Sequence, residues 1–207
     1  YVLDPRMFDG RLPPCANTRS MRVAGGLGTI PRVVGDAHEI YFGRIPVEEA
    51  LGRIDRLYRP YHAGLRDLVQ RTQRAFGTCI LVDAHSMPSS GLDRDGPVKP
   101  DIILGDRFGT SAAAYITDIA EAAFTRLGLS VTRNRPYAGG FITEHYGAPG
   151  SGVHTLQIEI NRALYMDEAT LLPHAGFGAL EQAVASAMAD CFARWSGWLE
   201  EFRQAAE

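Results

Sequence analysis

Short apolar runs alternate along the chain with longer stretches in which apolar residues recur every three or four positions. The short runs predict buried strands, and the longer stretches predict amphipathic helices. The predicted strands are residues 79–82, 101–105, 131–134 and 155–162, and the predicted helices are residues 46–77, 110–127 and 178–206. Strands that alternate with helices are typical of α/β domains. We therefore expect a single three-layer α/β domain over residues 1–207, with a mixed, largely parallel central sheet flanked by helices.

The first predicted helix contains a proline. Pro60 has no amide hydrogen and its ring clashes with the preceding turn, so we expect a kink or break there. His62 follows it and fits a structural histidine better than a ligand, although both readings stay open. Residues 1–46 show little periodicity, which predicts ordered loops with one hairpin near Gly35-Asp36. Gly25-Gly26-Leu27-Gly28 lacks the strand and helix that flank a phosphate-binding loop and is interpreted as a turn.

Polar residues follow the apolar run of residues 79–82 directly. A buried strand here would carry Asp83, His85 and Ser86 at its carboxyl end, where open α/β sheets bind their ligands. Asp83 and His85 are two residues apart and share one face of a strand, so the carboxylate can orient the imidazole. A lone histidine at such a position can also be purely structural.

A second candidate carboxylate lies in the last predicted strand. Residues 155–162 alternate between aliphatic and polar positions, so Glu159 lies mid-strand on the face opposite the aliphatic one. Such a carboxylate is either solvent-facing or functional. The preceding segment, residues 134–152, is long and rich in glycine and carries Tyr137 and His145. These features are typical of a functional loop.

Composition and charge narrow the class of protein. The chain has 207 residues, of which 45% are hydrophobic and 22% charged, enough for a sizeable core. A net charge of −3 without a Lys/Arg run gives no indication of nucleic acid or an anionic membrane as partner. No apolar stretch approaches the roughly 18 residues of a membrane span. The cysteines (Cys15, Cys79 and Cys191) lack CxxC spacing, which favours a reducing cytoplasm over disulfides or a thiolate zinc site.

Four longer motifs resemble those of a known family. They are Val82–Pro88, Pro100–Gly109, Asn134–Gly140 and Gln157–Arg162, and they follow the order found in N-formylglutamate amidohydrolases. Shorter similarities accompany them at Gly26-Leu27-Gly28, Ile30-Pro31-Arg32 and Tyr61-His62. The resemblance implies a zinc-dependent hydrolase that cleaves the amide of an N-acylated acidic amino acid. The implied substrate is N-formyl-L-glutamate, and the products are formate and L-glutamate.

That family is similar in turn to zinc carboxypeptidases and aspartoacylases, which implies a zinc carboxypeptidase-like fold. By this resemblance His85 is a zinc ligand and Glu159 is the catalytic base, while Tyr137 belongs to a loop that carries an active-site tyrosine. Asp83 is then expected to orient His85 without binding the metal. The family's first two zinc ligands would lie before Tyr1, so we expect the chain to lack an N-terminal segment.

The implied substrate has two carboxylates, for which arginine is a natural bidentate partner. Arg135 and Arg162 adjoin the expected site, and Arg107 is a weaker candidate. An arginine at any of these positions also fits an ordinary surface or structural ion pair. His154 is a further candidate for substrate binding, as is His145.

Two rival functions stay open at this point. A serine or thiol hydrolase would use Ser86 or Cys79 with a histidine. Ser86 and His85 are adjacent, however, and would point to opposite faces of a strand, and no Gly-x-Ser-x-Gly elbow occurs. A metal-free pseudoenzyme or anion-binding module, or a related deacylase or peptidase, would share the fold and its motifs. The sequence gives no indication of the oligomeric state.

Overall fold

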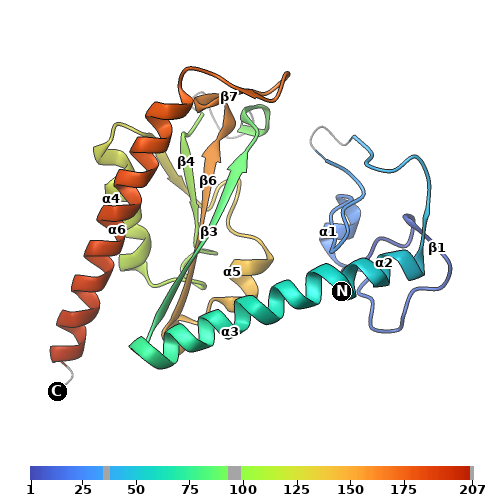
Figure 1. Cartoon of the computed structure of the whole chain (residues 1–207), viewed down its shortest axis with the longest axis horizontal. Coiled ribbons are helices and arrows are strands. Elements are labelled where there is room, and N and C mark those ends of the chain that lie inside the picture. The colour runs from blue at the N-terminus through green and yellow to red at the C-terminus, as the bar shows by residue number, and fades with distance from the viewer. Residues whose placement is uncertain (35–37, 93–98, 206–207) are drawn as a thin grey trace. The chain divides into compact units, whose positions relative to one another are not determined.

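The computed structural model describes residues 1–34, 38–92 and 99–205 (Figure 1). The chain divides into two compact units, Tyr1–Leu68 and Val69–Glu207, and each is described by itself. The expectation of a single domain therefore stays a prediction. Within the described residues, no helix is both long enough and apolar enough to cross a membrane.

The second unit is built around a four-stranded sheet with the strand order β3-β6-β4-β5 (Figure 1). Its strands are β3 (Cys79–Met87), β4 (Ile102–Gly105), β5 (Val131–Arg133) and β6 (Val153–Asn161). β3 runs parallel to β6 and β4 runs parallel to β5, whereas β4 and β6 are antiparallel. The expected mixed, largely parallel sheet is thus confirmed.

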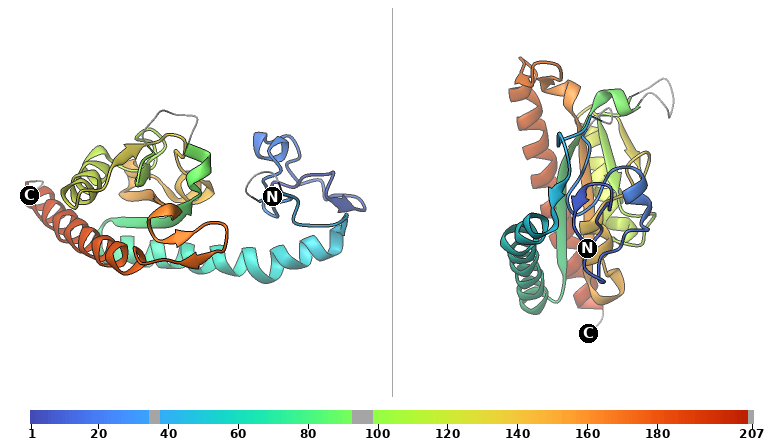
Figure 2. Two further views of the ribbon diagram at one scale, coloured as in Figure 1. Left: turned by 90° about the horizontal axis from the view of Figure 1, so that it is seen from above. Right: turned by 90° about the vertical axis from the view of Figure 1, so that its right-hand side faces the viewer.

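Two long helices cover one face of this sheet. α4 (Ala114–Arg126) and α6 (Phe177–Ala205) lie side by side in Figures 1 and 2. The core between the helices and the sheet is made of buried apolar side chains, among them Ile102, Leu104, Ile116, Phe124, Leu156, Ile158 and Trp195. Burying a side chain of this size contributes about 1.5–3 kcal/mol to stability. The Trp195 indole in α6 also donates to the Ile116 carbonyl in α4 (3.2 Å), which satisfies its polar atom.

Shorter elements complete the second unit. α5 (Phe141–Tyr146) lies on the side of the sheet opposite α4 and α6 (Figure 1). The others are the 3₁₀ turns η3 (Ser89–Leu92), η4 (Pro149–Ser151) and η5 (Arg162–Leu164) and the hairpin of β7 (Met166–Asp167) with β8 (Leu172–Pro173). The sequence predicts α5 as loop, because a helix of fewer than two turns between Gly140 and Gly147 shows no periodicity.

The expected helix over residues 46–77 consists of three consecutive parts. These are α2 (Val47–Arg53), the π-helical turn η2 (Ile54–Tyr58) and α3 (Arg59–Phe76). The kink or break expected at Pro60 corresponds to an interruption of the regular α-helical bonding in η2, directly before Pro60, while α3, which begins at Arg59, includes the proline in its first turn. In η2 the Arg59 amide donates to the Ile54 carbonyl, five residues back. This wider turn comes just before the proline, where the regular bonding pattern lacks a donor.

The first unit contains less regular structure. β1 (Phe8–Asp9) pairs in parallel with β2 (Ile45–Pro46), and α1 (Met21–Ala24) is a single turn. Its core consists of buried apolar residues from both ends of the unit, namely Leu3, Met7, Phe8, Ile30, Val47, Ala50 and Ile54. The hairpin expected near Gly35-Asp36 lies outside the described residues. Val33 and Glu39, on either side of it, form an antiparallel bridge.

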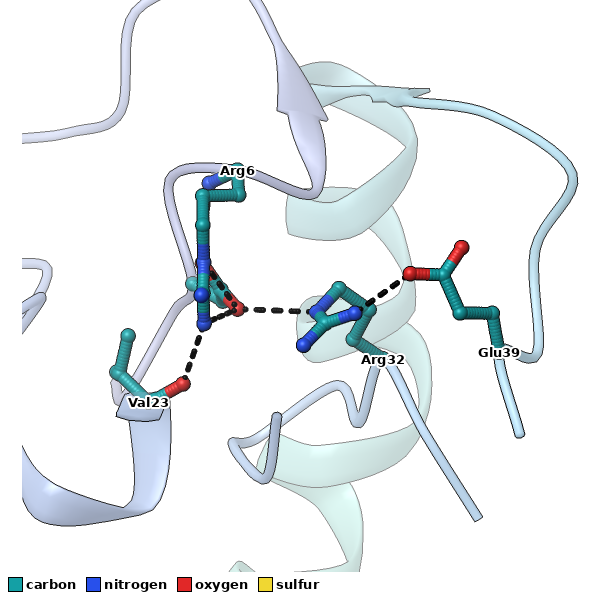
Figure 3. Close-up of polar contacts among 5 residues, drawn as sticks. Arg6, Val23, Arg32 and Glu39 are labelled. Atoms are coloured by element: carbon teal, nitrogen blue, oxygen red, sulfur yellow. Dashed lines mark hydrogen bonds and ion pairs between the residues drawn. The ribbon is translucent and has the colours of Figure 1, made fainter. Parts of the chain in front are cut away.

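One buried carboxylate ties the loops of the first unit together (Figure 3). Asp4 is 1% exposed and accepts hydrogen bonds from Arg6 Nε (2.9 Å) and from Arg32 Nε (3.3 Å). Arg6 also donates to the Val23 carbonyl (2.8 Å), and Arg32 to Glu39 (2.7 Å). The hydrogen bonds from Arg6 lower the pKa of Asp4, although burial alone would raise it. The ionised carboxylate and its two arginines therefore connect the chain at residues 4–6 with α1 and with the segment around Arg32.

We expect Asp4→Asn to lower the free energy of unfolding by about 1–3 kcal/mol, because two arginines lose their charged acceptor. Urea denaturation at neutral pH measures this loss. Because folding lowers the pKa of Asp4, the stabilisation is complete above its unfolded pKa of about 4 and disappears as the pH falls through the folded value. Glu39→Gln is the matched control on the exposed end of the network, with an expected change below about 0.5 kcal/mol. An equal loss in both variants would contradict the role of Asp4.

Candidate active site

The parallel register of β3 with β6 brings the two candidate residues together. His85 pairs with Glu159, and Asp83 pairs with Gln157. Because side chains alternate along a strand, these four share one face of the sheet. It is the face opposite the one that α4 and α6 cover, since Leu156 and Ile158 point into that core. We call these four residues the polar face.

Glu159 is the most buried carboxylate of the polar face, with 6% of its surface exposed. Its Oε1 atom accepts a hydrogen bond from Gln157 Nε2 (2.8 Å), and its buried Oε2 atom has no partner among the described residues. Burial raises the pKa of Glu159, and the charge of Asp83 adds to this, while His85, Gln157 and Arg162 oppose it. A carboxylate with a raised pKa and one free oxygen is suited to taking up and releasing a proton.

His85 is held by its neighbour on the same strand. Its Nε2 atom lies 3.0 Å from Asp83 Oδ1, and its side chain is half-exposed. This contact leaves Nδ1 as the ring nitrogen available to a further ligand. The other oxygen of Asp83, Oδ2, is buried and has no partner among the described residues. The expected orienting contact from Asp83 to His85 is therefore present in the geometry.

Tyr137 lies close to the polar face in the loop after β5. It is half-buried against Met87 and Ile103. Burial raises the pKa of the Tyr137 phenol, the negative charge of Glu159 raises it further, and Arg162 opposes both. The phenol therefore lies within the electrostatic field of Glu159 and of the arginine that follows β6.

Arg162 begins η5, directly after the carboxyl end of β6. Its Nε atom donates to Ser86 Oγ (3.1 Å), and its NH2 atom donates to the Ser86 carbonyl (3.3 Å). These contacts fix the guanidinium at the end of β3, one residue beyond His85. The structure thus gathers His85, Glu159 and Arg162 near the carboxyl ends of β3 and β6.

Other residues singled out from the sequence lie elsewhere. His154 is five residues before Glu159 and so points to the opposite face of β6, where it is buried and its Nδ1 accepts from the Ala113 amide (3.3 Å). Burial lowers the pKa of His154. Arg135 is exposed in the loop after β5, and Arg107 pairs with Glu144 (3.6 Å).

The two other histidines considered from the sequence, His62 and His145, pack against aromatic rings. His145 stacks on Phe141 with ring centroids 4.9 Å apart. His62 belongs to the first unit, where it is buried and lies 4.2 Å from the Tyr58 ring. The structural interpretation of His62 agrees with this packing.

The chain is similar in sequence to proteins of one family. A family model for N-formylglutamate amidohydrolase matches residues 3–166. The chain belongs to the N-formylglutamate amidohydrolase family. It is 33% identical over 122 residues to an N-formylglutamate deformylase of Pseudomonas putida, covering 58% of this chain and 46% of that protein. Against the Pseudomonas aeruginosa PAO1 deformylase the identity is 33% over 144 residues, covering 68% and 54%.

A solved structure supports the same assignment. The crystal structure of N-formylglutamate amidohydrolase from Ralstonia eutropha JMP134 superposes with a TM-score of 0.84 at 32% identity. The match covers 96% of this chain and 71% of that one. The chain spans about half the length of the curated relatives it matches. The fold of the family is therefore shared over nearly the whole chain.

The polar face of this family member fits part of a cation site. The unpartnered buried oxygens of Asp83 and Glu159 beside His85 form an arrangement that a positive charge would stabilise. In the part of the chain that the structure describes, no three His, Cys, Asp or Glu side chains are grouped to hold a metal ion. These residues can thus supply one imidazole and a negative environment, but not a complete coordination sphere.

Sequence reasoning gave no role to Gln157. It is 4% exposed, and its amide contacts Glu159 directly. The available signal was the alternation of β6, which puts positions 157 and 159 on the same face.

A glycine at the end of β4 lets the Tyr137 loop approach the sheet. A Cβ atom on Gly105 would lie 2.8 Å from the Ala138 carbonyl carbon and from the Gly139 amide nitrogen. We expect Gly105→Ala to cost about 1–3 kcal/mol, because backbone must shift to make room. Thermal or urea unfolding measures the loss. Gly197→Ala in α6, where a Cβ meets no atom within 4 Å, is the control and should leave stability unchanged or raise it. Equal stability of the Gly105→Ala protein would contradict this close approach.

Proposed function

We propose that the protein is a zinc-dependent amidohydrolase that converts N-formyl-L-glutamate to formate and L-glutamate. The observation that supports this most directly is the pairing of buried Glu159 with His85 on one face of the sheet. The names of the relatives, N-formylglutamate deformylase and N-formylglutamate amidohydrolase, supply the substrate. Because the chain spans only part of those proteins, activity and substrate are proposals for the whole protein.

The zinc proposal starts from the chemistry of the substrate. A formamide carbonyl is a weak electrophile, and a bound zinc ion supplies polarisation of its oxygen together with a lowered pKa of attacking water. His85 would hold the metal through Nδ1, while Asp83 fixes the ring through Nε2. The remaining ligands are proposed to lie outside the described residues.

In the proposed reaction Glu159 acts as general base and then as general acid. Its free Oε2 atom accepts a proton from the attacking water, and the water oxygen forms a bond to the formyl carbon. Glu159 then returns that proton to the nitrogen as the carbon–nitrogen bond breaks, which releases glutamate and formate. The raised pKa of the buried carboxyl favours this exchange in both directions.

Residues near the carboxyl ends of β3 and β6 are proposed to orient the substrate. Arg162, whose charge acts to lower the pKa of Glu159, is proposed to bind a substrate carboxylate, because guanidinium pairs with carboxylate in a bidentate geometry. Tyr137, which feels the charges of both Glu159 and Arg162, is also proposed to contact the substrate, as is Arg135 from its exposed loop. His154 is left out of this proposal because it points away from Glu159.

The contacts of Ser86 and Cys79 weigh against a serine or thiol hydrolase. The Ser86 hydroxyl accepts a hydrogen bond from Arg162, which lowers its nucleophilicity. Cys79 is buried, and burial raises the pKa of its thiol, so little reactive thiolate forms at neutral pH. All three cysteines are free, which agrees with the further proposal of a cytoplasmic enzyme.

We expect the full-length protein to bind about one zinc ion per chain and His85→Ala to lose it, because removing one ligand collapses the affinity. Elemental analysis of purified, folded protein measures the zinc content. His145→Ala is the matched control, since it removes an exposed imidazole of α5, and it should retain the metal. Stoichiometric zinc in the His85→Ala protein would refute the ligand role.

The sharpest test of the base is Glu159→Gln, which keeps the shape of the side chain but cannot accept a proton. We expect zinc content and KM to persist while kcat falls about 10²- to 10⁴-fold. Release of formate from N-formyl-L-glutamate measures the rate. Glu144→Gln, an exposed carboxylate of α5, should stay fully active. Near-normal kcat in a zinc-replete Glu159→Gln enzyme would rule out this role.

A further inference from the structure

Gln157 is the buried group that connects the two sides of the candidate site. Its Nε2 atom donates to Glu159 Oε1 (2.8 Å), and its Oε1 atom accepts from the Gly140 amide (2.8 Å). Both ends of the side chain are therefore bonded within the protein. Because only 4% of Gln157 is exposed, water competes little for these two hydrogen bonds.

The turn held by Gln157 directly follows Tyr137. Gly139 adopts a φ of +119°, which favours glycine, and the Arg107 amide donates to the Ala138 carbonyl (2.8 Å). On the far side of the turn the Thr143 hydroxyl donates to the Gly140 carbonyl (2.8 Å). The Gly140 amide is the point at which the turn is bonded to the polar face.

We propose that Gln157 is a positioning residue that fixes the Glu159 carboxylate and the Tyr137 loop relative to each other. This inference rests on the proposed function for its catalytic part. The Gln157 amide is bonded to Glu159 Oε1 at one end and to the Gly140 nitrogen at the other. A movement of the turn is therefore transmitted to Oε1 of Glu159. The bond to Oε1 also leaves Oε2 as the oxygen that exchanges the proton. The role of Gln157 is positional: its amide acts on the reaction through Glu159, to which Nε2 is bonded.

The variant that removes both contacts at similar volume is Gln157→Met. We expect the Gly140 amide to exchange with solvent roughly 5- to 10-fold faster, as the loss of one hydrogen bond predicts, in residue-resolved hydrogen exchange. In zinc-loaded full-length enzyme we expect kcat to fall about 10- to 100-fold with KM changed by less than about 2-fold. Gln157→Asn carries the same amide one methylene shorter, so it cannot span both partners and should lose kcat as well.

Thr78→Val is the matched control, because it removes a side-chain hydrogen bond to the Gly152 carbonyl at the amino end of β3 and leaves both bonds of Gln157 in place. It should retain kcat within about 2-fold and leave the Gly140 amide protected. An unchanged Gly140 exchange rate in Gln157→Met, or an equal loss of kcat in Thr78→Val, would overturn the positioning role. Absence of deformylase activity in the wild type, with the expected change in Gly140 exchange, would instead overturn only the proposed reaction.

Discussion

The parallel pairing of β3 with β6 is the constraint on which the rest of the second unit depends. The register places His85 opposite Glu159 and Asp83 opposite Gln157, so one set of backbone hydrogen bonds brings all four together. A slip of one residue would turn one strand's side chains to the other face and separate the pair. The buried aliphatic residues of β6 prevent this slip, because they would then leave the core beneath α4 and α6.

Burying the polar face costs free energy of folding, and the apolar packing on the opposite face of the sheet offsets this cost. Glu159 and Gln157 lose hydration, and each regains only part of it through their mutual hydrogen bond. The opposite face contributes close packing of apolar side chains from β4, β6, α4 and α6, which stabilises the sheet. The cost remains concentrated on one oxygen each of Asp83 and Glu159, for which the described part of the chain offers no hydrogen-bond partner. Such localised cost is typical of sites that bind a charged ligand or a reacting group.

Much of the fold could be predicted from local pattern, because α4, α6 and the strands carry clear periodicity. Alternation alone placed Glu159 opposite the aliphatic face of β6, and the strand-end rule selected His85. The adjacency of these strands could not be read from the sequence, since Glu159 follows His85 by 74 residues. The contact of Gln157 with the Gly140 amide is likewise set by tertiary structure, and His154, a candidate for substrate binding, lies on the face of β6 opposite Glu159. Pro60 indicated where the long helix changes, but no local pattern reveals that the change is a π-helical turn before the proline.

The sheet order also bears on how the molecule folds. β3 is an edge strand whose one neighbour in the described sheet is β6, although β4 and β5 are made between them in the chain. During synthesis β3 therefore emerges well before its partner and must wait for a long loop to close, a step that slows folding. Asp83 and His85 give the unpaired β3 strand polar side chains. Polar and charged side chains on edge strands discourage association with other chains. The residues proposed for chemistry would thus also reduce association between chains before β6 has paired with β3.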